Sequence, residues 1–216
     1  MACPVRLGTK FALRFLPPRG IRSSLSVVVF SAALFCAPHL YAQESVFILE
    51  PSKSSVEFTL GASLHTVHGT FKLKSGEIHF DPAKGTASGA IVVDALSGES
   101  GNEGRDKKMH QEILETPKFS EIVFVPTHVE GKIAPQGTSQ VAVSGIMKLR
   151  GQDHEITLNF AVLPGTPGQE QATTRFAIPY VKWGLKNPST FILRVSDRVD
   201  IEIHASGQLT SADPHH

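Results

Sequence analysis

Hydrophobic and polar residues alternate along most of the chain from about residue 46 onward. Between residues 55 and 60, for example, Val56, Phe58 and Leu60 alternate with a serine, a glutamate and a threonine. This period of two predicts antiparallel strands with one apolar face and one face in water. Many such strands in one chain close into a barrel or stack as a sandwich. No helical pattern alternates with them, which excludes a parallel α/β sheet.

The segment from 105 to 124 breaks the alternation. Ser100 and Glu103 have the spacing of a capping box, and Met109 and Ile113 then share one face at helical spacing. Pro117 is expected to end this helix. A short amphipathic helix among strands has to cover apolar surface. Two interpretations remain open: a plug over the end of a barrel, or a lid at the mouth of an apolar cavity.

The first 42 residues are typical of a secretory signal. A basic start is followed by the apolar run Leu25–Ala37 and by Leu40-Tyr41-Ala42. An uncleaved membrane anchor is the alternative, but the run is shorter than the roughly 20 apolar residues that a membrane span needs. We therefore expect a signal peptide at 1–42, one barrel domain at 43–210 and a disordered tail at 211–216. The mature protein would be periplasmic or secreted.

Removing the signal changes the composition of the chain. Both cysteines, Cys3 and Cys36, lie in the removed part, so the mature chain has no thiol and no disulfide. Five of the 21 basic residues are also removed, which leaves 16 against 20 acidic residues and a net charge of −4. A mildly acidic exported chain is a poor candidate for nucleic-acid binding.

The polar faces of the strands indicate which side meets water. They carry full charges such as Lys72, Lys74, Asp200 and Glu202, and the chain has only two tyrosines and one tryptophan. Barrels of the outer membrane instead have an apolar outer face and aromatic girdles. We therefore expect the apolar face to line the interior of a barrel in solution.

The sequence offers little catalytic or metal-binding chemistry. It contains no nucleophile elbow, phosphate-binding loop or dinucleotide fingerprint. His65 and His68 are three residues apart, so in a strand their side chains point to opposite faces. We predict no enzyme activity, no metal site and no cofactor. Arg105 and Asp106 are either a structural ion pair that holds the helix or an anchor for the polar head of a ligand.

Large apolar residues inside a barrel either fill it or contact a ligand, and small barrels of about eight strands do both. Glycines in or beside the strands, such as Gly69 and Gly145, are expected to leave interior space or to permit sharp bending. The candidate lining residues share an apolar side chain on the inward face or near the barrel end. They are Phe58, Leu60, Phe71, Leu73, Ile78, Phe80, Ile91, Val93, Met109, Ile113, Phe119, Phe124, Leu158, Phe160, Phe176, Ile178 and Trp183.

Several short motifs, in this order along the chain, resemble the YceI-like lipid- and polyisoprenoid-binding family. The matching residues are 68–71 with 76–81, then Arg105-Asp106 with Met109, Phe119 and 122–124, then Gly145 with 149–151 and 156–158, and finally Trp183-Gly184-Leu185. The resemblance extends from about Val46 to Leu209, which is nearly the whole mature chain.

The resemblance implies an exported, lipocalin-like antiparallel β-barrel whose elongated apolar interior binds a long chain. The expected partner is an isoprenoid, a quinone or a similar amphiphilic lipid, with transient membrane contact and a monomeric or homodimeric state. Two other functions remain open: a structural or stress-response barrel that holds no ligand, and an enzyme that acts on such a lipid. The lack of a nucleophile–base pair argues against the enzyme.

Overall fold

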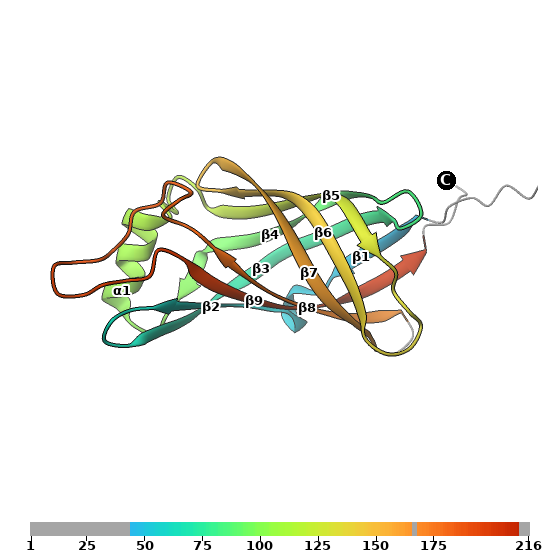
Figure 1. The fold of residues 1–216 in the computed structure, drawn as a ribbon, viewed down its shortest axis with the longest axis horizontal. Helices are drawn as coiled ribbons and strands as arrows, with labels where there is room; N and C mark the ends of the chain where they lie inside the picture. Colours follow the sequence, from blue (N-terminus) through green and yellow to red (C-terminus); the bar gives the residue numbers. More distant parts are fainter. Residues whose placement is uncertain (1–43, 166–167, 212–216) are drawn as a thin grey trace, which may run out of the picture. The chain divides into compact units, whose positions relative to one another are not determined.

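The computed structural model describes residues 44–165 and 168–211 (Figure 1). The expected signal peptide lies outside these residues. The strands are β1 (Ser45–Leu49), β2 (Ser55–Gly61), β3 (Thr66–Asp81), β4 (Thr86–Glu99), β5 (Glu121–Gly131), β6 (Ser139–Leu149), β7 (Gln152–Pro164), β8 (Gln169–Ile178) and β9 (Val199–Ser211). The helical segments are η1 (Pro51–Lys53), α1 (Glu103–Lys108) and η2 (Met109–Ile113). None of the described helices is long and apolar enough to span a membrane.

The strands form one closed antiparallel barrel with eight strand positions. Neighbouring strands pair in the order β3, β2, β9, β8, β7, β6, β5, β4, and β4 pairs again with β3. The remaining strand, β1, shares a position with β2. Val56 of β2 pairs with Phe71 in the first half of β3, whereas Phe47 of β1 pairs with Ile78 in its second half. The predicted barrel is therefore confirmed, and the sandwich is excluded.

The alternation along the strands separates the two faces of the barrel wall. On β7, Leu158 and Val162 are buried, while Thr157, Asn159 and Leu163 between and beside them are exposed. Burying a side chain of this size stabilises the fold by about 1.5–3 kcal/mol. The apolar face points inward, as predicted. Ser211, expected in the tail, instead ends β9 and pairs with Ser45 of β1.

Gly69 and Gly145 do not leave empty space beside them. A Cβ atom on Gly69 would lie 2.2 Å from Cζ of Phe58, and one on Gly145 would lie 2.9 Å from the ring of Phe124. Neighbouring aromatic rings already occupy these positions. The glycines therefore allow large side chains to pack against the backbone of the next strand.

The helical segment lies between β4 and β5, as predicted, but its ends differ from the prediction. The N-cap is Asn102, whose side-chain oxygen accepts a hydrogen bond from the backbone N–H of Arg105 at 2.9 Å. The Ser100–Glu103 capping box does not form. The helical run also ends before Pro117, because Glu115 adopts the left-handed conformation with a φ of 51°.

The barrel wall is incomplete between β7 and β8. Their pairing runs only from Phe160 and Thr174 to Pro164 and Glu170, and the other residues of the two strands have no partner in this ladder. The turn that follows β8 packs against the unpaired part of β7. There the Trp183 ring stacks on the His154 ring with centroids 4.1 Å apart and planes 3° apart. This turn completes the wall.

Candidate functional site: an apolar barrel interior

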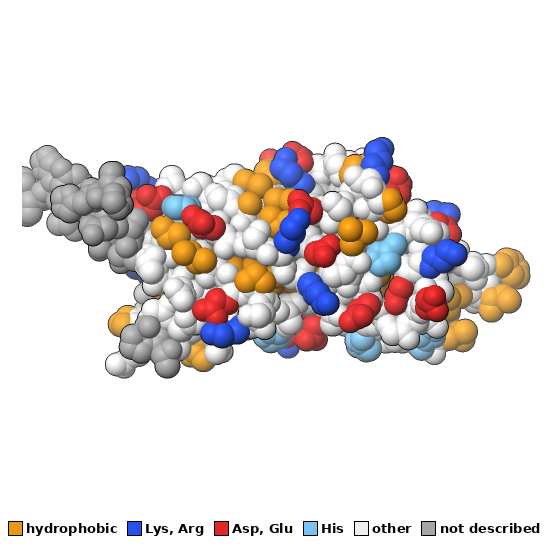
Figure 2. Space-filling view, turned by 180° about the vertical axis from the view of Figure 1, so that it is seen from behind, with side chains coloured by type: hydrophobic (Ala, Val, Ile, Leu, Met, Phe, Trp, Pro, Cys, Tyr) orange, Lys and Arg blue, Asp and Glu red, His pale blue; other side chains and the backbone are white. Residues whose placement is uncertain are grey.

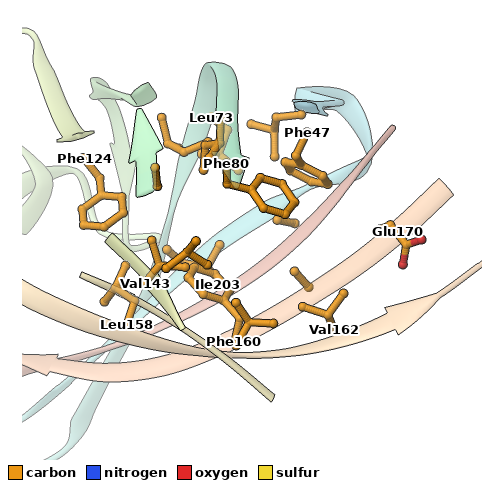
Figure 3. Close-up of a pocket in the computed structure, with 18 of the residues that line it drawn as sticks. Phe47, Leu73, Phe80, Phe124, Val143, Leu158, Phe160, Val162, Glu170 and Ile203 are labelled. Carbon is orange, nitrogen blue, oxygen red and sulfur yellow. The ribbon is translucent and has the colours of Figure 1, made fainter. Parts of the chain in front are cut away.

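Two adjoining cavities lie inside the barrel. The first, called here the distal cavity, has a volume of about 160 Å³ (Figure 3). Its lining includes Phe47 and Leu49 of β1, a strand that lies at the end of the barrel away from α1 in Figure 1. Side chains from every strand except β2 line it, and all of them are apolar except Glu170. Figure 3 shows Phe80, Phe160 and Leu158 directed into this space.

The second, called here the mouth cavity, has a volume of about 420 Å³ and lies beside α1. This is within the range of roughly 300–1,000 Å³ that is usual for small-molecule sites. Its walls are apolar, but its rim carries polar side chains. The rim residues are His65, Ser100, Asn102, Arg105, Lys108 and Thr190. Because His65, Asn102 and Thr190 are exposed, the cavity reaches the surface at this end.

Ile122 of β5 lines both cavities, which therefore adjoin at this side chain. On one side of Ile122 lies the apolar distal cavity, and on the other lies the larger cavity with its polar rim. This arrangement matches an amphiphile, because an apolar chain can lie inward while a polar head stays near water.

The structure brings most of the predicted lining residues to the two cavities. The distal cavity has eight of them: Leu73, Ile78, Phe80, Ile91, Val93, Phe124, Leu158 and Phe160. The mouth cavity has six: Phe58, Leu60, Phe71, Met109, Ile113 and Ile178. These positions come from six different strands and from the helical segment, so the cavities exist only in the closed barrel.

Three predicted lining residues are not part of either lining. Phe119 packs beside Gly151, with Nζ of Lys118 at 4.9 Å from its ring centroid. Phe176 packs against the core cluster that contains Leu158 and Ile178. Trp183 packs against the same cluster and stacks on His154. All three help to hold the wall around the cavities.

Arg105 and Asp106 are joined through Ser100. The guanidinium of Arg105 donates to the Ser100 hydroxyl at 2.6 Å and to the Ser100 carbonyl at 2.7 Å. The Asp106 carboxylate accepts hydrogen bonds from the backbone N–H of Ser100, at 2.9 Å, and from its hydroxyl. These bonds fix the start of α1 against the end of β4. Arg105 also lines the mouth cavity, whereas Asp106 does not.

The helical segment forms one wall of the mouth cavity. Met109, Ile113 and Leu114 face this space, which stays open beneath them. The segment is tied to β4 by His110, whose Nε2 lies 2.8 Å from the carbonyl oxygen of Gly98. A plug would fill the barrel end, so this geometry favours the lid.

Replacing Met109 with Gly is therefore expected to accelerate ligand release. The change removes apolar contact with the cavity and lowers helix propensity by about 1 kcal/mol. The dissociation rate of a fluorescent prenyl lipid should rise by more than the loss of unfolding free energy explains. Lys107→Gly is the control, because it lowers helix propensity in the same segment at an exposed site outside both linings. A lower denaturation midpoint with an unchanged release rate would identify the segment as a plug.

Glu170 of β8 is the functional candidate that sequence reasoning missed. It is the one charged residue in the lining of the distal cavity, and its Oε2 is buried without a hydrogen-bond partner among the described residues. Burial raises the pKa of this carboxyl group above its ordinary value. The period-two pattern of β8 could have identified Glu170, because it places this residue on the same inward face as Ala172 and Thr174.

Glu170→Gln is expected to stabilise the protein at neutral and alkaline pH. A carboxyl with a raised pKa in the folded state binds its proton more tightly there than in the unfolded state. The ionised Glu170 carboxylate therefore destabilises the folded protein only above the pKa that this group has in the unfolded chain. The destabilisation grows as the pH rises and is complete once the pH exceeds the pKa of the group in the folded state. Denaturant titrations should show the variant more stable than wild type at pH 8 and equal to it near pH 4. The exposed Glu155→Gln is the control, and an identical effect of both changes would contradict the assignment.

The two histidines considered as metal ligands lie apart. His65 is on the rim of the mouth cavity, and Nδ1 of His68 is 3.1 Å from the hydroxyl of Thr59. Within residues 44–165 and 168–211, no three His, Cys, Asp or Glu side chains gather in a way that could hold a metal ion.

Solved structures with this fold include two bacterial proteins. The BcnA protein of Burkholderia cenocepacia has a TM-score of 0.60 and 19% identity, and the match covers 73% of this chain and 98% of BcnA. A polyisoprenoid binding domain from Saccharophagus degradans, implicated in plant cell wall breakdown, has a TM-score of 0.57 and 16% identity. That match covers 76% of this chain and 98% of the domain. At these identities the likeness shows a shared fold.

Sequence comparison leads to a family. A UPF0312 protein of Vibrio cholerae is 28% identical over 199 residues, which cover 87% of this chain and 98% of that protein. A UPF0312 protein of Shewanella oneidensis is 31% identical over 136 residues, which cover 61% of this chain and 68% of that protein. The model of the YceI-like domain matches residues 47–206, nearly the whole barrel. The chain therefore belongs to the YceI-like domain family.

Proposed function

We propose that this protein is an exported binding protein or carrier for a long-chain isoprenoid, a quinone or a similar amphiphilic lipid. The observation that carries the proposal is the closed barrel with two adjoining apolar cavities. Burying each methylene group of a ligand is favourable by about 0.8 kcal/mol. A long chain can therefore bind tightly inside the barrel without specific polar contacts.

The distribution of polar groups supports an amphiphile whose head lies at the mouth. Arg105 and Lys108 on the rim can interact with a polar or anionic head, while the apolar chain extends past Ile122 into the distal cavity. The related fold of a polyisoprenoid binding domain supports the same class of ligand. No catalytic role is proposed, because the sequence offers no nucleophile–base pair.

A filled structural barrel is the second candidate. Its interior would be closely packed, as protein cores are, with few voids larger than a water molecule. The mouth cavity of about 420 Å³ favours the ligand-binding function instead.

Export remains part of the proposal and rests on the leader at 1–42. N-terminal sequencing of the mature protein should begin at or near Gln43, and the protein should be found in the periplasm or the medium. Recovery of the full-length chain from the inner membrane would overturn this part.

Organic extraction of the purified protein, followed by mass spectrometry, tests the proposed ligand. A prenyl or other long-chain lipid should be recovered in near-stoichiometric amount from the folded protein. Protein unfolded and washed free of lipid before extraction serves as the control. If no lipid is recovered and the refolded protein binds no prenyl lipid, the barrel has the structural role.

A further inference from the structure

Three large hydrophobic side chains are exposed at the end of the barrel that carries α1. Leu64 is 74% exposed, Phe191 is 100% exposed and Ile192 is 81% exposed. We refer to these three residues as the apolar tip. Figure 2 shows hydrophobic side chains on the projection at this end, whereas charged and hydrophobic side chains are mixed over the barrel wall. Exposed apolar groups gathered in this way are typical of a binding surface.

The backbone holds the apolar tip in its exposed position. Leu64 belongs to the turn between β2 and β3, and the other two residues belong to the loop between β8 and β9. The backbone N–H of Ser63 donates to the carbonyl of Arg194 at 2.8 Å, and Ala62 forms a β-bridge with Val195. The two loops therefore project as one unit.

The same loop also forms part of the mouth cavity. Thr190 and Leu193 on either side of the tip, together with Val195, line the cavity, and the N–H of Thr190 donates to the carbonyl of Leu193 at 2.8 Å. This turn directs Phe191 and Ile192 to the outside while Leu193 faces the cavity. The apolar tip consequently stands directly beside the cavity opening.

Basic residues are frequent in the segments that form this end of the barrel. Segments 100–108 and 181–198 contain seven of the 16 Lys and Arg residues that follow the leader, but only three of the 20 acidic residues. The seven are Arg105, Lys107, Lys108, Lys182, Lys186, Arg194 and Arg198, and we refer to them as the basic collar. Outside these segments the mature chain is strongly acidic. The excess of basic residues in these two segments is complementary to an anionic surface. One of the seven, Lys186, also forms a salt bridge with Glu112, with 2.6 Å between Nζ and Oε2.

We propose that the α1 end of the barrel docks onto a lipid bilayer that contains anionic lipids. The apolar tip inserts between the headgroups, and the basic collar contacts anionic lipid heads. Insertion and electrostatic attraction together are what stable attachment of a peripheral protein needs. In this orientation the mouth cavity opens against the membrane, so an apolar chain enters the barrel without crossing water. This inference goes beyond ligand binding and assigns the surface through which the ligand is exchanged.

Flotation with phospholipid vesicles tests the docking. The full mature protein should bind vesicles of phosphatidylcholine with phosphatidylglycerol, and bind less to phosphatidylcholine alone or at high salt. The double change Phe191→Ser with Ile192→Ser should weaken binding to the mixed vesicles by about tenfold or more. Leu163→Ser is the matched control, because Leu163 is 47% exposed on β7 outside the tip. It should bind as wild type does.

The charge contribution has its own variant. Arg194→Gln with Arg198→Gln should reduce the preference for vesicles that contain phosphatidylglycerol and leave the weak binding to phosphatidylcholine unchanged. Thermal unfolding of each variant checks that the barrel is folded.

Three results would overturn the docking. They are the absence of wild-type binding to the mixed vesicles, equal binding by wild type and the tip double variant, and a concentration-dependent dimer that the tip changes abolish without any vesicle binding. The last result would identify a second copy of this chain as the partner of the tip. Binding of a short-chain prenyl lipid in solution should be unaffected by the tip changes. Failure of docking is therefore distinguishable from failure of the proposed ligand function.

Discussion

Phe160→Asp is expected to abolish lipid binding and to destabilise the barrel by at least about 3 kcal/mol. Loss of a phenylalanine side chain from a protein core costs about 3–5 kcal/mol. Phe160 is partly buried, so the lower end of this range applies, and an unpaired carboxylate in an apolar interior adds to it. Phe160 pairs with Val141 of β6 and Thr174 of β8 and points into the distal cavity (Figure 3). Chemical denaturation and titration with a prenyl lipid measure the two effects.

Leu163→Asp is the matched control, since it introduces the same charge on the same strand. Leu163 lies on the outward face of β7, where a carboxylate remains in water. This variant should fold and bind with little change. If both variants were equally destabilised, the assignment of the inward face of β7 would be wrong.

Ile122→Trp is expected to remove the advantage of long chains over short ones. Ile122 is the side chain at which the two cavities adjoin, and a tryptophan there fills the passage between them. The affinity for short prenyl chains should change little, because these fit within the mouth cavity. For long chains, each pair of methylene groups kept out of the distal cavity should weaken binding by roughly tenfold.

The control for this variant is Ile122→Val, which keeps the passage open and should preserve the dependence on chain length. Overpacking by tryptophan is expected to lower stability by about 1–3 kcal/mol, so binding is compared only for folded protein. If Ile122→Trp kept the wild-type preference for long chains, the ligand would not extend from one cavity to the other.

Strand periodicity was enough to predict which residues face inward, because the two faces of a strand differ in polarity. It correctly placed Leu158 and Phe160 on the interior face of β7. The same pattern could not separate a cavity-lining residue from a packed one. Phe176 lies on the inward face of β8 as expected, yet it packs against the core cluster outside both linings.

Contacts between distant residues account for what the sequence did not predict. Trp183 packs in the barrel wall because β7 and β8 are not paired beside His154, which leaves the His154 ring free to stack on Trp183. His154 lies 29 positions earlier in the chain, so local sequence does not indicate this contact. The loop between β8 and β9 has no strand or helix periodicity, but Leu193 and Val195 line the mouth cavity. The sequence also could not decide which residue caps α1, because serine and asparagine are both preferred at this position. The N-cap is Asn102 rather than Ser100.

The measurement that tests the central claim most directly is a titration of delipidated protein with isoprenoids of increasing chain length and one common head group. If the chain occupies the two adjoining cavities, affinity should rise with each added isoprene unit until the interior is full, and then level off. Arg105→Ala should weaken binding moderately at every length, because it acts on the head group. A flat affinity across the whole series would contradict the account and leave the barrel without a long-chain ligand.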